Sequence, residues 1–154
     1  VLVAKVWFIT GASRDLGRIW AETALERGDS VAVTARGVEP LAELADRFGE
    51  RVFVRALDVR DRKDVFAAVA EVRERFGRID LQSAAGYSYT GAIEELDFDE
   101  AKANFDTNVF GAPWFMQAAV PVLREQGDGH ITGIGAQAIP HQPPAAAYPR
   151  RVYL

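Results

Sequence analysis

Apolar positions along the chain alternate between short continuous runs and longer stretches with helical spacing. The short runs are typical of strands buried on both faces of a parallel sheet. They cover residues 3–9, 30–35, 52–57, 79–85 and 131–136. Between them, apolar residues recur every three or four positions and predict helices. These begin near Leu16, Pro40 and Asp61 and end at Gly28, Gly49 and Gly77.

Two further helical segments are predicted over residues 98–124, where Gly111 and Pro113 predict a bend. The prolines after Gln137 predict a segment that is mostly loop. Strands that alternate with helices of this length predict an α/β fold, in which a parallel sheet is doubly wound with strand order 3-2-1-4-5. We expect residues 1–154 to form one domain.

Composition narrows the class of protein. Hydrophobic residues make up 49% of the 154 residues, which is enough for a core, and the formal net charge of −4 argues against nucleic acid as the main partner. The chain has no cysteine, which excludes disulfides and thiolate metal sites, and we predict no metal site. No stretch approaches the roughly 20 apolar residues of a membrane helix, and no signal peptide is recognisable. We therefore expect a cytoplasmic protein with no membrane partner.

The segment Thr-Gly-Ala-Ser-Arg-Asp-Leu-Gly, residues 10–17, lies between the first predicted strand and the first predicted helix. The N–H groups at the start of a helix carry partial positive charge and bind pyrophosphate. Gly11 permits a tight turn, and Gly17 permits close packing of the helix on the strand. The alternative is an ordinary turn between a strand and a helix, where glycine and serine are common.

This segment resembles the TGxxxGxG loop of the short-chain dehydrogenases/reductases, with Asp15 in place of the middle glycine. Aspartate tolerates a left-handed backbone, so we expect the turn to form, although the carboxylate weakens pyrophosphate binding. The resemblance covers residues 5–148 and implies a Rossmann-type fold. It also implies the cofactor-binding residues, which are Gly11, Ser13, Arg14, Leu16, Gly17, Arg36, Asp58, Val59, Ala85 and Gly86.

The choice of nucleotide depends on the end of the second predicted strand. NAD-preferring folds usually carry an acidic residue there, on the ribose 2′-hydroxyl, whereas this chain has Arg36. Arg36 and Arg14 are placed to donate charge-assisted hydrogen bonds to a 2′-phosphate, which favours NADP(H) over NAD(H). The alternative is that both are solvated surface arginines. Glu39 lies close by, but a position at the start of a helix explains it better.

The other cofactor residues are assigned by the resemblance. Asp58 and Val59 match the family's adenine-binding pair, in which the aspartate accepts a hydrogen bond from the adenine amino group and the valine backbone contacts the ring. Ala85 and Gly86 retain the second half of the family's Asn-Asn-Ala-Gly segment. Asn108 matches the helical asparagine that helps to relay protons.

The catalytic group is incomplete in this sequence. Tyr148 matches the family's tyrosine, but Val152 stands where the family has the lysine that lowers the pKa of the tyrosine hydroxyl. Arg151 supplies charge without reproducing the ribose contacts of that lysine. The family's serine aligns with one of two residues that have no hydroxyl, Gly135 or Ala136. His130 and His141 are interpreted as surface residues beside turns.

The resemblance implies an NADP(H)-dependent oxidoreductase that interconverts an alcohol and a carbonyl by hydride transfer. One alternative is a catalytically impaired nucleotide-binding protein or a truncated form of such an enzyme, because family members usually continue beyond the tyrosine segment. Another is a Rossmann-like scaffold that binds no nucleotide. We expect a small-molecule substrate and a homo-oligomer formed through the long helix, whose apolar residues include Phe110, Trp114, Phe115 and Val122.

Overall fold

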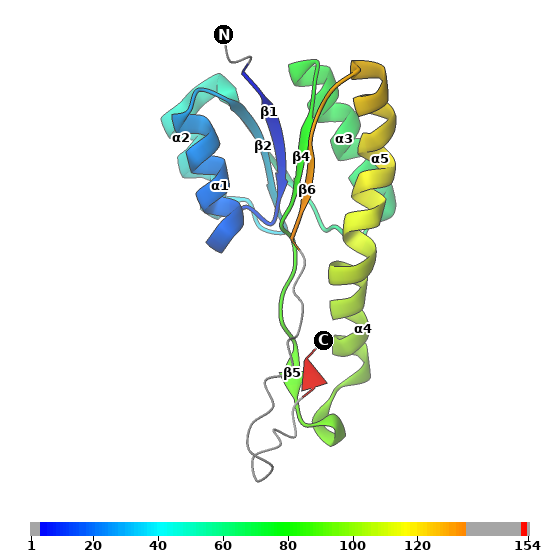
Figure 1. Cartoon of the computed structure of the whole chain (residues 1–154). Helices are drawn as coiled ribbons and strands as arrows, with labels where there is room; N and C mark the ends of the chain where they lie inside the picture. Colours follow the sequence, from blue (N-terminus) through cyan, green and yellow to red (C-terminus); the bar gives the residue numbers. More distant parts are fainter. Residues whose placement is uncertain (1–3, 135–151, 154) are drawn as a thin grey trace, which may run out of the picture.

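The computed structural model describes residues 4–134 and the backbone of residues 152–153. Its centre is a five-stranded parallel sheet with the order β3-β2-β1-β4-β6 (Figure 1). The strands are β1 (Val6–Thr10), β2 (Ser30–Ala35), β3 (Val52–Ala56), β4 (Asp80–Ser83) and β6 (Ile131–Gly133). Because β6 is the fifth strand of the predicted sheet, the predicted strand order is confirmed.

Helices cover both faces of the sheet (Figure 1). Helices α1 (Asp15–Glu26) and α2 (Ala42–Phe48) lie on one face, and α3 (Arg62–Phe76) and α5 (Gly111–Gln126) lie on the other. Helix α4 (Phe98–Phe105) lies beyond the carboxyl ends of the strands. Single 3₁₀ turns occur at Glu39–Leu41, Gly49–Arg51 and Ile93–Glu95. The α/β architecture with a doubly wound parallel sheet is therefore confirmed.

The link between α4 and α5 differs from the prediction. A π-helical segment, Asp106–Phe110, joins the two helices where we predicted a bend at Gly111 and Pro113. Gly111 instead allows a close contact, because a Cβ atom there would lie 2.9 Å from Cγ2 of Val59. Pro113 lies in the first turn of α5, directly after the π-helical segment. The sequence also did not predict the short antiparallel pair of β5 (Thr90–Gly91) and β7 (Val152–Tyr153).

The core consists of two apolar clusters, one on each side of the sheet. Alternate residues of β1 supply both clusters, since Phe8 packs with the α3 and α5 side and Ile9 packs with the α1 and α2 side. The ring of Phe8 meets the ring of Phe115 edge-on, with the ring centroids 4.6 Å apart. The continuous apolar run in the sequence therefore corresponds to a strand that is buried on both faces.

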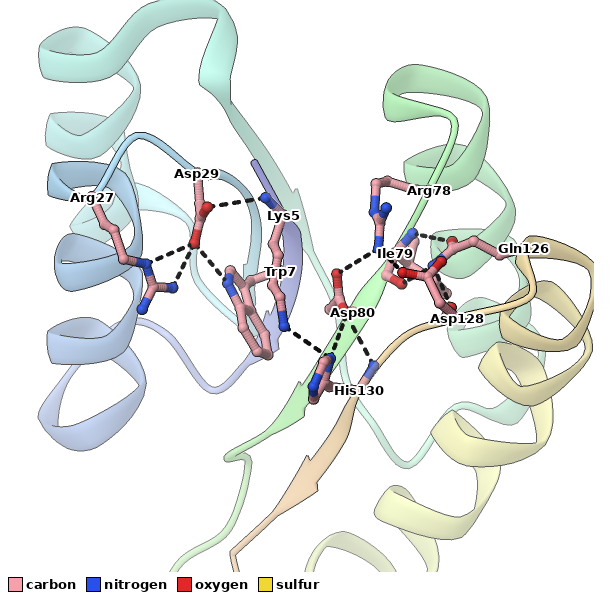
Figure 2. Close-up of polar contacts among 10 residues, drawn as sticks. All are labelled: Lys5, Trp7, Arg27, Asp29, Arg78, Ile79, Asp80, Gln126, Asp128 and His130. Carbon is pink, nitrogen blue, oxygen red and sulfur yellow. Dashed lines mark hydrogen bonds and ion pairs between the residues drawn. The ribbon is translucent and has the colours of Figure 1, made fainter. Parts of the chain in front are cut away.

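The amino edge of the sheet is held by two buried aspartates, Asp29 and Asp80 (Figure 2). Asp80 accepts a hydrogen bond from the His130 amide at 2.9 Å and thereby joins the starts of β4 and β6. The exposed imidazole of His130 lies between Asp80 and Lys5, with 2.8 Å from its Nδ1 to the Lys5 Nζ. This edge lies opposite the carboxyl ends of the strands, so we assign it a structural role.

Asp29 joins the starts of β1 and β2. Its Oδ1 accepts from the Lys5 amide at 3.0 Å, and its Oδ2 accepts from Trp7 Nε1 at 3.0 Å and from the Arg27 guanidinium. Burial opposes ionisation of this carboxyl, but the hydrogen bonds from Lys5, Arg27 and Trp7 outweigh burial and hold the pKa of Asp29 below its ordinary value. The ionised carboxylate therefore stabilises the fold.

We expect Asp29→Asn to lower the free energy of unfolding by about 1.5–3 kcal/mol near neutral pH, because three groups lose a charged acceptor. A lowered pKa means that the contribution of Asp29 is present above its ordinary pKa of about 4 and is lost as the pH falls through the folded-state pKa. The difference in the free energy of unfolding between the wild-type protein and Asp29→Asn should therefore become smaller in acid. Urea unfolding at pH 7 and pH 3 measures this. The exposed Asp46→Asn in α2 is the control, and a constant difference would contradict the prediction.

Candidate nucleotide-binding site

The glycine-containing loop, residues 10–17, leaves the carboxyl end of β1 and enters α1. Gly11 has a φ of 65° and Asp15 has a φ of 52°, which makes Asp15 the only non-glycine residue in the left-handed region among the described residues. The Ala12 amide donates to the Thr34 carbonyl at 3.0 Å and ties the loop to β2. Asp15 therefore adopts the backbone conformation that a glycine would favour, as the sequence predicted.

The two glycines of the loop are required by close backbone contacts. A Cβ atom on Gly11 would lie 2.8 Å from the Cα of Ala85, beyond the end of β4. A Cβ atom on Gly17 would overlap the carbonyl oxygen of Gly11 and lie 3.1 Å from the Cα of Ala12. Because these neighbours are backbone atoms, a larger residue at either position would open the loop.

The amide groups of the first turn of α1 directly follow this loop. The N-cap residue Arg14 makes no side-chain capping hydrogen bond, so the first amides of the helix have no capping partner from that side chain. The Asp15 carboxylate is 81% exposed and pairs with Arg14 at 3.4 Å. The amides and the helix dipole fit a phosphate group, whereas the nearby carboxylate opposes it.

Arg36 and Asp58 follow the carboxyl ends of β2 and β3, beside the loop. The Leu57 amide donates to the Ala35 carbonyl at 2.9 Å, which keeps these two strand ends together. The hydrogen bond from the Arg60 side chain is the main cause that lowers the pKa of Asp58, while burial opposes it and the positive charge of Arg36 adds a smaller contribution. The carboxylate of Asp58 is therefore ionised and lies within the field of Arg36.

Val59 turns its side chain into the core, where it is 8% exposed and packs against Gly111. The role of the Val59 backbone at an adenine ring, which the resemblance implies, stays a prediction. Ser13 is partly buried, and Leu16 is 50% exposed at the start of α1. The structure thus gathers all ten predicted cofactor residues at the carboxyl ends of β1, β2, β3 and β4.

The segment after β4 is held from two sides. Thr10 Oγ1 accepts hydrogen bonds from the amides of Ala84 at 3.1 Å and Ala85 at 3.2 Å. On the other side, the Asn108 side chain accepts from the Tyr87 amide at 3.1 Å and donates to the Tyr87 carbonyl at 2.8 Å. Ala85 and Gly86 therefore lie in a segment whose backbone is fixed before any ligand arrives.

Asn108 lies in the π-helical segment, and π-helical turns are frequent at functional sites. Asn104, one helical turn earlier, is 1% exposed and also donates to the Tyr87 carbonyl at 2.8 Å. The sequence analysis missed Asn104, although its spacing of four residues from Asn108 was a usable signal. The side chain of Asn108 positions the segment after β4, and its predicted role in a proton relay stays a prediction.

The predicted catalytic Tyr148 lies outside the described residues. So do Gly135 and Ala136, the two positions aligned with the family's serine, and His141 and Arg151; of Val152 only the backbone is described. Within residues 4–134, no cluster of three or more His, Asp or Glu side chains could hold a metal ion. Over the same part of the chain, no helix is both long and apolar enough to cross a membrane.

The long helical stretch corrects one sequence interpretation. Phe115 and Val122 were expected to add to an exposed apolar surface, but both are buried against the sheet. Their burial follows from helical periodicity, because they share the inward face of α5. The large exposed apolar residues of this stretch are Phe98, Phe105, Val109 and Phe110. Homo-oligomer formation stays a prediction, which light scattering can test.

A parallel sheet of this order, with the glycine loop at the end of β1 beside the switch point between β1 and β4, defines a Rossmann-type α/β domain. The sequence model of the short chain dehydrogenases matches residues 5–148. The chain belongs to the short-chain dehydrogenase family, as its motifs indicated.

Individual relatives agree with this assignment. The chain is 48% identical over 131 residues to an oxidoreductase of Botryotinia fuckeliana. The matched region covers 84% of this chain and 48% of that relative. A short-chain dehydrogenase from Streptomyces avermitilis superposes with a TM-score of 0.81 at 39% identity, over 85% of this chain and 49% of that one. An alcohol dehydrogenase from Thermococcus sibiricus, complexed with 5-hydroxy-NADP, has a TM-score of 0.76 at 32% identity, over 83% of this chain and 57% of that one. The chain spans about half the length of these relatives.

Proposed function

We propose that this chain forms, as one domain, the cofactor-binding part of an NADP(H)-dependent oxidoreductase that interconverts an alcohol and a carbonyl by hydride transfer. The observation that carries the proposal is the closed loop of residues 10–17, packed on the segment after β4, with Arg36 instead of a carboxylate directly after β2. Membership of the short-chain dehydrogenase family supports the class of reaction.

Each part of the site has a role in this proposal. The first amides of α1 hold the pyrophosphate, Gly11 permits the tight turn of the loop, and Gly17 permits close packing of α1 on that turn. Asp58 accepts from the adenine amino group, and Arg36 meets the 2′-phosphate with help from Arg14. When bound, the nicotinamide supplies the acceptor or donor of the hydride.

The protein's own groups prepare the place where substrate would bind. Asn108 and Asn104 hold the carbonyl of Tyr87, and Thr10 holds the amides of Ala84 and Ala85. These hydrogen bonds fix the backbone of the segment after β4 before the nicotinamide ring of the cofactor binds beside it. Less conformational entropy is therefore lost on cofactor binding. We assign Asn108 and Tyr148 to the catalytic centre, with Tyr148 as the group that exchanges a proton with the substrate oxygen.

NADP(H) is favoured over NAD(H) by the charges at the ends of β2 and β3. Arg36 is exposed, and its charge reaches Asp58, so it lies close to the position of the adenosine ribose. The Thermococcus sibiricus relative is complexed with an NADP derivative, which supports the same preference. The carboxylate of Glu39 also approaches this turn, since a Cβ atom on Gly37 would lie 3.0 Å from its Oε2. The negative charge of Glu39 therefore opposes a 2′-phosphate at this turn, whereas the positive charge of Arg36 favours it.

Arg36→Ala is expected to weaken NADPH binding by about 10- to 100-fold and to leave NADH binding unchanged, because a charge-assisted hydrogen bond contributes about 1.5–3 kcal/mol. Calorimetric titration of the wild-type protein and the variant with each nucleotide gives the four dissociation constants. Arg124→Ala, an exposed arginine in the last turn of α5, is the matched control. Equal affinities for NADPH and NADH that Arg36→Ala does not alter would remove the case for NADP(H).

A second candidate function is a nucleotide-binding protein with impaired chemistry. The observation in its favour is that the predicted cofactor residues lie together at the carboxyl ends of the strands, whereas Val152 and either Gly135 or Ala136 occupy the positions of the family's lysine and serine. Turnover separates the two candidates, and nucleotide binding alone does not.

A further inference from the structure

Arg60 occupies the carboxylate that we assign to adenine recognition. Its backbone amide donates to Asp58 Oδ1 at 3.0 Å, and its Nε lies 3.0 Å from both Oδ1 and Oδ2. A terminal guanidinium nitrogen donates to Oδ2 at 2.6 Å. Both oxygens of Asp58 are therefore engaged by a residue two positions further along the chain, in the turn between β3 and α3.

An adenine amino group must compete for those oxygens. An ionised carboxylate offers about four lone-pair sites, and Arg60 makes four contacts with the two oxygens of Asp58. The guanidinium fork matches a carboxylate better than a single amino donor does, because it donates two bonds in one plane. Free access to Asp58 therefore requires that the Arg60 side chain move.

We propose that Arg60 sets the affinity of this site for the adenine half of a nucleotide by occupying the Asp58 carboxylate. The inference rests on the proposed function, since it needs a bound adenine nucleotide. It concerns a residue that the sequence motifs do not single out, and it predicts that removal of a positive charge strengthens the binding of an anionic ligand.

The contact is weak enough to be displaced. The Arg60 side chain is 40% exposed and that of Asp58 is 33% exposed, and ion pairs at such exposure contribute at most about 1 kcal/mol. Arg60 also has a second acidic neighbour, because the negative charge of Asp106 raises its pKa after the larger contribution of Asp58. When Arg60 leaves Asp58, the negative charge of Asp106, which also pairs with Lys102 at 2.6 Å, still acts on Arg60.

The experiment measures binding of AMP and of nicotinamide mononucleotide to the whole chain by calorimetry. We expect Arg60→Ala to tighten AMP binding by about fivefold, the factor that corresponds to the upper limit for an exposed ion pair, and to leave nicotinamide mononucleotide unchanged. Arg60→Lys keeps the charge without the fork and should also tighten AMP binding. Arg62→Ala, in the first turn of α3, is the control and should change neither ligand.

A double variant tests whether the effect passes through Asp58. In an Asp58→Asn background, Arg60→Ala should no longer tighten AMP binding. Unchanged or weaker AMP binding in both Arg60 variants overturns the inference and leaves the nucleotide site intact. Tightening that persists in the Asp58→Asn background overturns it as well. If neither AMP nor NADPH binds to the wild-type protein or any variant, the proposed function fails together with the inference.

Discussion

Gly17→Ala should abolish measurable nucleotide binding while leaving the sheet folded. The added methyl group would overlap the Gly11 carbonyl and press on Ala12, both of which are backbone atoms of the phosphate loop. Alanine gains about 1 kcal/mol of helix propensity over glycine, but overpacking against atoms that cannot rotate away costs about 1–3 kcal/mol. The clash outweighs the propensity and displaces the loop amides.

The expected size is a loss of at least about 100-fold in NADPH affinity, because a loop displaced by about 1 Å cannot make the short hydrogen bonds to phosphate. Fluorescence titration with NADPH measures the affinity, and circular dichroism confirms that the fold is retained. A Gly17→Ala variant that binds NADPH like the wild-type protein would refute the placement of the phosphate site.

Asp15→Gly in the same loop provides the opposite comparison. Glycine adopts the φ of 52° without strain, and the change removes a carboxylate beside the proposed pyrophosphate position. Two like charges about 4 Å apart in water repel each other by about 1 kcal/mol, so we expect NADPH and NADH binding to tighten alike, by about fivefold. If Gly17→Ala weakens nucleotide binding and Asp15→Gly strengthens it, the loop contacts the nucleotide, because general destabilisation of the fold would weaken binding in both variants.

The second large effect concerns turnover. The chain should reduce carbonyl compounds very slowly, because Tyr148 has no lysine four residues later to lower its pKa and no serine hydroxyl is present at Gly135 or Ala136. A tyrosine hydroxyl with its ordinary pKa of about 10 is a poor base for alcohol oxidation near neutral pH, and it is a weaker proton donor for carbonyl reduction than a hydroxyl whose pKa a lysine lowers. Ala136→Ser combined with Val152→Lys is expected to raise the rate of NADPH oxidation by about 10²–10³.

The absorbance of NADPH, followed with a panel of small ketones and aldehydes, measures this rate. Tyr148→Phe added to the double variant should remove the gain, and His141→Ala added to it should not. Each single change should have a smaller effect than the pair, because groups of one catalytic unit do not act independently. Fast turnover by the unchanged chain that Tyr148→Phe does not affect would show that the catalytic centre is elsewhere.

Much of the site could be predicted from the sequence because its parts follow strand ends. Once the apolar runs predicted parallel strands, their carboxyl ends had to meet at one edge of the sheet. Residues such as Gly11, Arg36, Asp58 and Ala85 directly follow those ends, so local order along the chain was enough to bring them together. The left-handed backbone of Asp15 was predictable in the same way, from one position in a known type of loop.

Contacts between side chains were not predictable from that order. Helical periodicity places Phe115 and Val122 on one face of α5, but only the structure shows that this face meets the sheet and that Phe110, in the π-helical segment, is exposed. Nor does the sequence indicate that Asn104 and Asn108 both reach the Tyr87 carbonyl, because this needs the π-helical segment and the path of residues 84–91.

The sequence by itself determined the strand order, the position of the glycine-containing loop and the family of this protein, because hydrophobic period and local turn chemistry act over a few residues. The tertiary structure decided which groups those elements bring into contact. It placed Arg60 on Asp58, the backbone of Gly11 against Ala85, and the asparagines of the π-helical region against Tyr87. These contacts depend on how whole helices and strands pack, and packing is a property of the complete core.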